Sequence, residues 1–451
     1  MFNRVLVANR GEVAVRVIRA LHELGVEAVA VYSTADRDSL HVRLADRAVC
    51  IGPPAAAESY LRIPSVVGAA ETTRCDGVHP GWGFLAENPA FVTACEQNEL
   101  VFVGPGADVM ERMGDKTRAK VELEAADVPV VAGTDRPTGL EDARSVADEI
   151  GYPVLLKAAS GGGGKGMRLV AAPDELEGAF RSAAAEAEAA FGDGALYVER
   201  CLRLARHVEI QVLADGEGRV LTLGERECSI QRRHQKLIEE SPSEAIGPHT
   251  REAMEAAAER ATRAIGYRNA GTFEFLLGPD GSYYFIELNA RLQVEHPVTE
   301  LVCGVDLVRE QLRIAAGEPL RSTGRAPRRG HAVECRINAE DPKRGFAPAP
   351  GRIESLRAPL GPGVRFDTHV EAGTLIPPQY DSLLAKLVVW DENRPAAISR
   401  ALRALGELEL RGVSTTRELA IDVLRSEEFA EGRYSTTFLE QAAGRLPALI
   451  A

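Results

Sequence analysis

The apolar positions of the first 110 residues alternate between short continuous runs and stretches with helical spacing. The continuous runs lie at residues 5–8, 26–32, 48–51, 77–78 and 100–103. A helical pattern at residues 12–24 separates the first two runs, and helical stretches precede the later ones. Strands that alternate with helices predict a doubly wound parallel sheet. Its first turn holds one glycine, Gly11, whereas a dinucleotide-binding turn needs several, so we interpret Gly11 as an ordinary turn residue.

The pattern changes between residue 128 and about residue 202, where we expect a small α+β insert. Strands are predicted at residues 153–159 and 167–170, with a glycine cluster between them and an Ala/Glu-rich helix after them. From Arg206 onward strands dominate, and several form hairpins. A helical pattern at residues 395–410 is expected to pack against this last region.

The composition is that of an ordinary globular protein. The chain has 451 residues, enough for roughly three domains. Its 53 basic and 66 acidic residues give a net charge of −13, which argues against nucleic acid and anionic membranes as partners. Seven cysteines without a Cys-x-x-Cys pair suggest neither a disulfide framework nor a cysteine zinc site, and they fit a reducing cytoplasm. No apolar run approaches the ~20 residues that span a bilayer, so we expect a soluble protein.

A glycine cluster at residues 161–164, followed by Lys165 and Gly166, presents unhindered backbone N–H groups to which a phosphate can come close. Lys157 on the preceding strand adds positive charge. The residues that follow have an extended pattern, which argues against a dinucleotide fold, and Gly166 stands where a nucleotide P-loop needs Ser or Thr. We therefore interpret the segment as a mobile flap over the phosphates of a nucleotide. A flexible surface hairpin is the alternative.

Two carboxylates suggest a cation site. Glu274 and Glu287 lie in two runs that a turn-rich linker joins as a hairpin. A four-residue loop would pair Glu274 with Phe285 and make the two carboxylates diagonal neighbours, about 7–8 Å apart. Such a pair repels unless it shares cations, and magnesium or manganese with a nucleotide would explain it. A second polar face, formed by His207, Glu209 and Gln211, is expected simply to meet water.

Polar residues occupy every odd position from Glu287 to Glu295. A straight strand would hold these two carboxylates about 26 Å apart, so one shared site requires the chain to bend after Asn289. Arg291 can hold an anion beside Glu295, which can remove a proton. A solvated edge strand is the alternative interpretation.

Three further groups are weaker candidates on their own. Trp82 lies in a Pro/Gly-rich loop that either lines a site or packs locally. Arg336 either stabilises an oxyanion or pairs with Asp341, and the salt bridge is the interpretation we favour. The basic patch at residues 231–236 either holds an anionic substrate or forms a solvated edge, and the sequence favours neither.

Together these motifs resemble the biotin carboxylases, which are ATP-grasp enzymes. The resemblance covers essentially the whole chain, with motifs at residues 8–12, 79–85, 113–116, 157–167, 206–211, 231–236, 271–275, 289–297 and 331–341. It implies an α/β and α+β protein with the ATP-grasp fold. The implied parts are a Rossmann-like N-terminal domain at residues 1–113, an ATP-grasp domain at 114–317 with a mobile glycine-flap lid at about 131–202, and a C-terminal biotin carboxylase domain at 331–440.

The resemblance also assigns roles to residues. It implies that ATP is held by Lys116, Lys157, Gly162, Gly163, Gly164, Lys165, Gly166, Glu199, Arg200, Leu202, His207, Gln231 and His234. It implies that Mg²⁺ or Mn²⁺ is bound by Glu274, Glu287 and Asn289. Bicarbonate and biotin would contact Trp82, Lys236, Arg291, Gln293, the Val294 backbone and Arg336.

The reaction implied by the resemblance starts at Glu295, which deprotonates bicarbonate. The activated bicarbonate attacks the γ-phosphate and gives carboxyphosphate, which breaks down to carbon dioxide and phosphate. The phosphate takes the ureido proton of biotin, and Arg336 stabilises the enolate. Three positions depart from residues common in the family, namely Trp82 for Tyr, Lys165 for Arg and Arg200 for Lys. These departures concern nucleotide affinity and the substrate loop and leave the reaction unchanged.

The partners follow from the resemblance and from one missing motif. The biotin attachment signature Met-Lys-Met is absent, so biotin is expected on a separate biotin carboxyl carrier protein. Carboxyltransferase subunits would complete an acetyl-CoA or other acyl-CoA carboxylase, of which this chain performs the first half-reaction. A homodimer is expected, with Arg16, Arg19 and Glu23 on one exposed charged helix face. The alternatives are a pyruvate carboxylase complex, another ATP-grasp ligase and a catalytically silent homologue.

Overall fold

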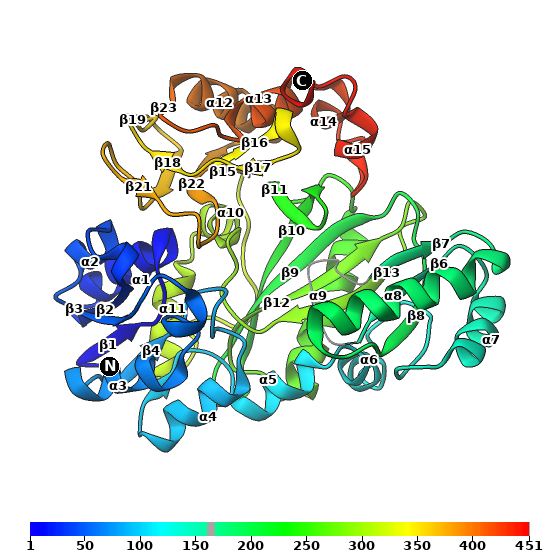
Figure 1. Cartoon of the computed structure of the whole chain (residues 1–451), viewed down its shortest axis with the longest axis horizontal. Coiled ribbons are helices and arrows are strands. Elements are labelled where there is room, and N and C mark those ends of the chain that lie inside the picture. Colours follow the sequence, from blue (N-terminus) through cyan, green and yellow to red (C-terminus); the bar gives the residue numbers. More distant parts are fainter. Residues whose placement is uncertain (160–166, 451) are drawn as a thin grey trace.

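The computed structural model of the protein describes residues 1–159 and 167–450. A long central sheet separates an N-terminal unit (blue in Figure 1) from a small three-stranded layer on the opposite side. Helices and short strands from the C-terminal residues lie at the end of the central sheet. The glycine segment that we interpret as a flap, with Lys165, lies outside the described residues. No helix of the described ranges has the length and apolar character that crossing a membrane requires.

The N-terminal unit contains the predicted parallel sheet, in the order β3-β2-β1-β4-β5. Its strands are β1 (Arg4–Val7), β2 (Glu27–Ser33), β3 (Arg47–Gly52), β4 (Gly77–His79) and β5 (Val101–Phe102). The sheet is doubly wound, because helices cover both of its faces, and successive β1 residues contact helices on opposite faces. Val5 and Val7 pack with α1 (Gly11–Glu23), whereas Leu6 packs with α3 (Ile63–Thr73) and α4 (Pro89–Gln97).

Helix α1 does not present the free charged face that we predicted. Arg16 is largely buried and forms ion pairs with Glu300 and Asp306 at 2.9 and 2.6 Å. Glu23 lies 3.6 Å from Arg309, and Arg19 is exposed. The helix packs its charged side against α11 (Leu307–Ala315), which explains why Arg16 has partners within the chain.

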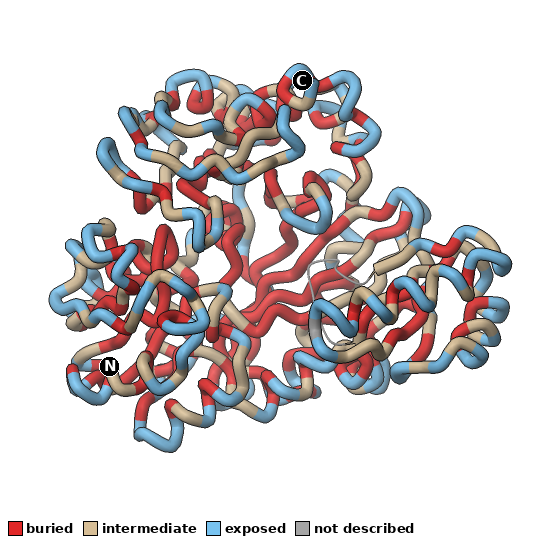
Figure 2. The backbone as a smooth tube through the Cα atoms, viewed as in Figure 1, coloured by how far each residue is buried: buried red, intermediate tan, exposed pale blue. Residues whose placement is uncertain are grey.

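The central sheet places β13-β12-β9-β10-β11-β15-β22-β20 side by side. Its strands are β9 (Arg206–Ala214), β10 (Val220–Arg232), β11 (Gln235–Ser241), β12 (Asn269–Leu277), β13 (Tyr283–Asn289), β15 (His331–Asn338), β20 (Val364–Thr368) and β22 (Leu383–Asp391). Because β11 pairs with β15, one sheet continues from the predicted ATP-grasp region into the predicted C-terminal region. Figure 2 shows that most of this sheet is buried along its length.

Helices pack against one face of the central sheet along its length. On this face, α9 (Pro248–Ala264) packs against Val208, Ile210 and Val212 of β9. Further along the sheet, α12 (Arg394–Glu407) and α13 (Arg417–Arg425) pack on the odd-numbered residues of β15 and β22. Helix α12 confirms the predicted C-terminal helix but ends three residues early, because the chain turns into the short strand β23 (Glu409–Arg411).

The insert forms a separate small layer, seen at the right of Figure 1. Its sheet has the order β7-β6-β8, with β6 (Val154–Ala158), β7 (Arg168–Val170) and β8 (Leu196–Arg200). Helices α7 (Leu140–Ile150) and α8 (Leu176–Phe191) cover one side of it. The predicted strands and the helix are therefore present, and the described ends of β6 and β7 flank the glycine segment.

Candidate functional site

A cavity of about 580 Å³ opens between the central sheet, the three-stranded layer and the Trp82 loop. Its wall brings together residues that the sequence analysis selected from widely separated motifs. They are Trp82, Lys116, Lys157, Leu202, His207, Gln231, His234, Lys236, Glu274, Glu287, Asn289, Arg291, Gln293, Val294, Glu295 and Arg336. One concave site that collects titratable side chains from so many elements is the strongest candidate for the functional site.

The two predicted metal-binding carboxylates are closer than the four-residue loop implied. Five residues separate the paired Leu277 and Tyr283, and the register shifts between Glu274 and Phe275. The longer loop and the β-bulge each shift the pairing by one residue, which brings Glu287 directly opposite Glu274. The diagonal arrangement that we predicted is therefore wrong, and the two carboxylates face each other across neighbouring strands.

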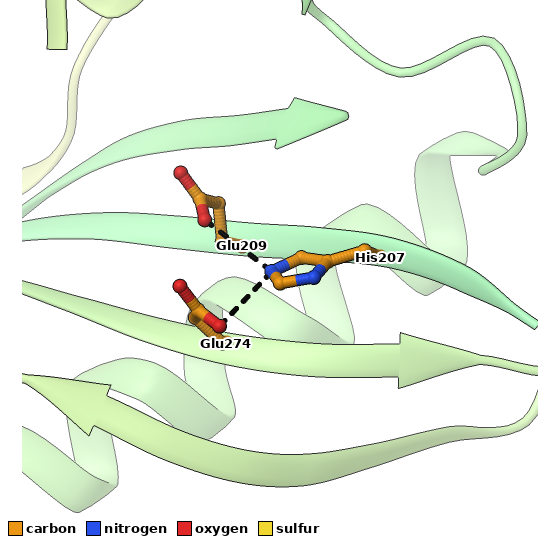
Figure 3. Close-up of side chains that lie close together, drawn as sticks. All are labelled: His207, Glu209 and Glu274. Carbon is orange, nitrogen blue, oxygen red and sulfur yellow. Dashed lines mark ion pairs between the residues drawn. The ribbon is translucent and has the colours of Figure 1, made fainter. Parts of the chain in front are cut away.

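The polar face of β9 does not meet water, contrary to our interpretation. His207, Glu209 and Gln211 are all buried. Figure 3 shows His207 between two carboxylates, with its Nε2 atom 3.1 Å from Glu274 and 3.5 Å from Glu209. Burial alone would lower the pKa of His207, but Glu274 and Glu209 raise it to about 9. His207, Glu209 and Glu274 therefore form one buried ion-pair cluster.

Lys236 lies at the centre of the site. Its Nζ atom contacts Glu209, Glu274 and Glu295 at 2.6, 2.9 and 2.6 Å. Burial would lower the pKa of Lys236, but the three carboxylates raise it well above its ordinary value. Lys236 of the basic patch therefore lies in the cavity wall and not on a solvated edge, whereas His234 at the turn of the same hairpin is exposed. The positive charge of Lys236 thus offsets part of the negative charge of three carboxylates in the cavity.

Arg226 contacts this cluster through Glu209, and the sequence analysis missed it. Its side chain is fully buried, and its Nε atom lies 2.5 Å from Glu209. The guanidinium also donates to Gln211, Thr272, Gln293 and Thr299 at 2.6–3.0 Å. Charged residues at 225, 226 and 227 within an otherwise apolar strand were the available signal, since unpaired charges are not buried in a sheet.

The chain bends after Asn289, as the sequence required. Strand β13 ends there, and Pro297 lies in the first turn of α10 (His296–Cys303). Within the bend, Arg291 is 2.7 Å from Glu87 and donates a 2.8 Å hydrogen bond to the Asn289 amide oxygen. The alternative of a solvated edge strand is therefore wrong, because the segment folds into the cavity wall.

Glu295 is held at both carboxylate oxygens. Oε1 contacts Lys236, and Oε2 lies 3.0 Å from Arg336. Burial would raise the pKa of Glu295, but Lys236 and Arg336 lower it to about 2. Arg336 also contacts Glu239 at 2.5 Å, so the salt bridge to Asp341 that we favoured is wrong. The structure places a carboxylate and two cations at one point of the cavity, which is the arrangement that an activated anion needs.

Lysines gather at the end of the cavity beside the three-stranded layer. Lys116, the first residue of α6 (Lys116–Glu124), lies 3.4 Å from Glu287. Lys157 and Lys120 both contact the carboxylate of the buried Glu199 on β8. The sequence analysis missed Lys120, although its position four residues after Lys116 places it on the same helix face.

Glu199 and Arg200, two of the predicted nucleotide contacts, are not part of the described cavity wall. Arg200 follows Glu199 along β8 and is exposed. Gly162, Gly163, Gly164, Lys165 and Gly166 lie outside the described residues. The roles of all these residues remain predictions.

The donor groups of Glu274, Glu287 and Asn289 suit a hard divalent cation. All three line the cavity with oxygen atoms, and the Asn289 amide nitrogen donates a 2.8 Å hydrogen bond to Glu274. Glu287 is less buried and contacts only Lys116 among the ion pairs of the described chain. Magnesium and manganese prefer such oxygen ligands and commonly share them with phosphate.

Comparisons with known families match the chain in three consecutive parts. The profile described as "Biotin carboxylase, N-terminal domain" matches residues 1–110. The profile described as "Carbamoyl-phosphate synthase L chain, ATP binding domain" matches residues 115–323, and "Biotin carboxylase C-terminal domain" matches residues 334–441.

Individual relatives match almost the whole chain. The biotin carboxylase of Nostoc sp. is 50% identical over 442 residues, which cover 98% of this chain and 99% of the relative. A pyruvate carboxylase subunit from Methanothermobacter thermautotrophicus is 51% identical, covering 98% and 90%. A solved structure is also similar: the biotin carboxylase domain of the Hydrogenobacter thermophilus 2-oxoglutarate carboxylase superposes with a TM-score of 0.95. It is 46% identical, and the match covers 98% of both chains. That domain was solved as a dimer with MgADP, ADP and bicarbonate.

Proposed function

Because this chain belongs to the biotin carboxylase family, we propose that its cavity carboxylates biotin attached to a separate carrier protein. The fold is that of the family, with N-terminal, ATP-grasp and C-terminal parts, and the chain is an ATP-dependent carboxylating ligase. The order of substrates and the residues that hold them are our proposal.

The nucleotide end of the cavity lies between the three-stranded layer and the central sheet. Lys116 and Lys157 supply positive charge for the phosphates, and Glu274, Glu287 and Asn289 would hold magnesium or manganese there. When bound, the ion neutralises charge on the transferring phosphoryl group. Leu202, Gln231, His207 and His234 line the same cavity and complete the proposed nucleotide contacts.

The reaction end of the cavity holds bicarbonate between cationic side chains. Lys236 and Arg291 bind the anion, Gln293 and the Val294 backbone orient it, and Glu295 removes its proton. The freed oxygen forms a bond to the γ-phosphorus while the bond to the β–γ bridging oxygen breaks, which gives carboxyphosphate and ADP. Carboxyphosphate yields carbon dioxide and phosphate, and the phosphate accepts the ureido proton of biotin. Arg336 stabilises the enolate, which attacks carbon dioxide.

One observation carries this proposal: Glu295 lies between Lys236 and Arg336 in the same cavity as the oxygen ligands. An ATP-grasp ligase for another substrate would need the nucleotide end but not this anion-activating group. A silent homologue would have lost a ligand or the base, and the described residues retain both. Trp82 lines the wall on the side proposed for biotin.

We propose that the complete complex is an acetyl-CoA or other acyl-CoA carboxylase with separate carrier and carboxyltransferase subunits. Relatives from Nostoc sp. and Pseudomonas aeruginosa that match the chain end to end bear the name biotin carboxylase, which supports this choice. The Methanothermobacter relative belongs to a pyruvate carboxylase, so pyruvate is the alternative acceptor. A homodimer and a cytoplasmic location remain predictions.

The test is phosphate release from ATP with bicarbonate and magnesium, with and without free biotin, in the wild type and in Glu295→Ala. We expect turnover that requires bicarbonate, rises with biotin and falls about 100-fold or more in the variant, because no other described carboxylate occupies the base position. Turnover indifferent to biotin would favour another ATP-grasp ligase. Absence of turnover with intact ATP binding would favour the silent homologue.

A further inference from the structure

Lys386 is a fully buried lysine outside the residues discussed so far. It lies on β22, opposite Arg336 of β15 and Asp367 of β20. The neighbouring Leu387 points to the opposite face and packs on α12. Lys386 therefore points to the face of the sheet that carries Arg336, behind the reaction end of the cavity.

The Lys386 ammonium has two partners from distant parts of the chain. Its Nζ atom donates a 2.9 Å hydrogen bond to the Val294 carbonyl oxygen and lies 3.1 Å from Glu12 Oε2. Glu12 is buried in the first turn of α1. Glu12 is the carboxylate that pairs with this buried ammonium.

The first contact fixes the backbone beside the proposed base. The carbonyl of Val294 and the amide N–H of Glu295 belong to one planar peptide unit, so holding the oxygen restricts the orientation of that unit. The Glu295 side chain extends from this unit toward Lys236 and Arg336. A shift of the peptide would move the carboxylate away from both cations.

The second contact extends to the aromatic wall of the cavity. The other oxygen of Glu12 accepts a 3.1 Å hydrogen bond from the Trp82 indole Nε1 atom. A single buried ion pair therefore links the Glu295 segment to Trp82. This link depends on the indole N–H of Trp82, a hydrogen-bond donor that phenylalanine lacks.

We propose that Lys386 is a positioning residue that holds the Val294–Glu295 peptide for bicarbonate activation and, through Glu12, orients Trp82 toward biotin. This inference rests on the proposed function of the same cavity. A purely structural role would require only that the charges of Lys386 and Glu12 balance each other. A positioning role requires, in addition, the hydrogen bond to Val294.

The test compares Lys386→Met with the double variant Lys386→Met/Glu12→Gln. The single variant leaves the Glu12 carboxylate buried without a counter-charge, so its Tm should fall by several degrees. The double variant removes both charges, and we expect its Tm to recover. The kcat of bicarbonate-dependent phosphate release should stay about 10- to 100-fold below wild type in both variants, because both lack the donor to Val294. Recovery of kcat together with Tm would overturn the positioning role.

Two more variants can test the proposal if the first pair folds poorly. Trp82→Phe retains the ion pair but removes the indole N–H that reaches Glu12, so KM for free biotin should rise severalfold; an unchanged KM would overturn the link through Glu12. Arg394→Met is the matched control, because it breaks the buried Arg394–Glu240 pair, and neither of these residues lines the described cavity. It should lower Tm without lowering kcat.

A wild type without bicarbonate-dependent turnover would reject the proposed function, whereas an active wild type with an equally active double variant would reject only this inference.

Discussion

At the scale of single residues, the site depends on one ammonium group shared by three carboxylates. Lys236 contacts Glu295 directly and helps to hold the pKa of that carboxyl at about 2. A carboxylate with so low a pKa is a weak base. The bicarbonate that we propose at Lys236 would compete with Glu295 for the ammonium, which would raise the basicity of Glu295 when a proton has to be removed.

Lys236→Met should therefore abolish bicarbonate activation while leaving the nucleotide end intact. Without Lys236, the proposed bicarbonate loses a cation that holds it beside Glu295, so the base has no positioned substrate. We expect bicarbonate-dependent phosphate release to fall about 100-fold or more, with the Kd for ADP within about threefold of wild type. Lys343→Met removes an exposed lysine elsewhere and serves as the control. Equal kcat in wild type and Lys236→Met would contradict the account.

Sequence reasoning identified the residues with chemistry better than those that support them. Glu274 stood out because a second carboxylate, Glu287, shares its face, and Glu295 because polar residues occupy alternate positions of its segment, whereas Arg336 gained its role only through the resemblance. The carboxylate of Glu209 appeared to face water, because strict alternation on one strand cannot show that a second polar layer covers it. Arg226, which covers it, comes from a strand that pairs with β9 only in the folded chain.

At the scale of elements, buried ion pairs connect the central sheet to the C-terminal helices. Glu240 of β11 lies 2.6 Å from Arg394 at the start of α12 and 2.7 Å from His331 of β15, and it accepts a hydrogen bond from Tyr434. Burial would raise the pKa of Glu240, but His331 and Arg394 lower it to about 2. Glu240 therefore contributes stability that is present above its unfolded pKa of about 4.5 and is lost as the pH falls toward 2.

Glu240→Gln should be less stable than the wild type by about 3 kcal/mol at pH 7. The difference in Tm should shrink as the pH is lowered from 5 to 3, because the wild type loses the same interaction by protonation. Thermal unfolding followed at several pH values measures this directly. Glu431→Gln, in an exposed pair with Arg433, should change Tm little at any pH. A difference that stays constant with pH would contradict the assigned pKa.

Element positions were predictable where one pattern repeats, and register was not. The strands and helices of the N-terminal sheet follow directly from apolar runs separated by helical spacing. The pairing of Glu274 and Glu287 was misjudged because the loop is one residue longer than predicted and a bulge adds a second shift. Loop length and bulges depend on backbone hydrogen bonds that side-chain patterns do not specify.

At the scale of the whole molecule, the account predicts a homodimer. Arg19 is exposed on α1, and Glu23 lies 3.6 Å from Arg309, whereas Arg16 is already bound within the chain. Arg19→Glu should therefore weaken association by charge repulsion and leave the fold intact. Light scattering should give twice the chain mass of 48.5 kDa for the wild type and a lower mass for the variant at low concentration. A wild type of 48.5 kDa would reject the dimer.

The arrangement of the parts could be predicted only through resemblance. Apolar patterns indicated a parallel sheet, an insert and a strand-rich region. They did not indicate that β11 and β15 join the earlier and later strands of this strand-rich region into one sheet, because that pairing links residues more than ninety positions apart. The cavity lies where these parts meet, so its full lining appears only in the folded chain.

The most direct test of the central claim is transfer of ¹⁴C from labelled bicarbonate to biotin on a carrier protein, measured with ATP and magnesium. The account predicts acid-labile label on the biotin, formed in step with ADP, and almost none with Glu295→Ala. ADP formation that requires bicarbonate but leaves no label on biotin would contradict it.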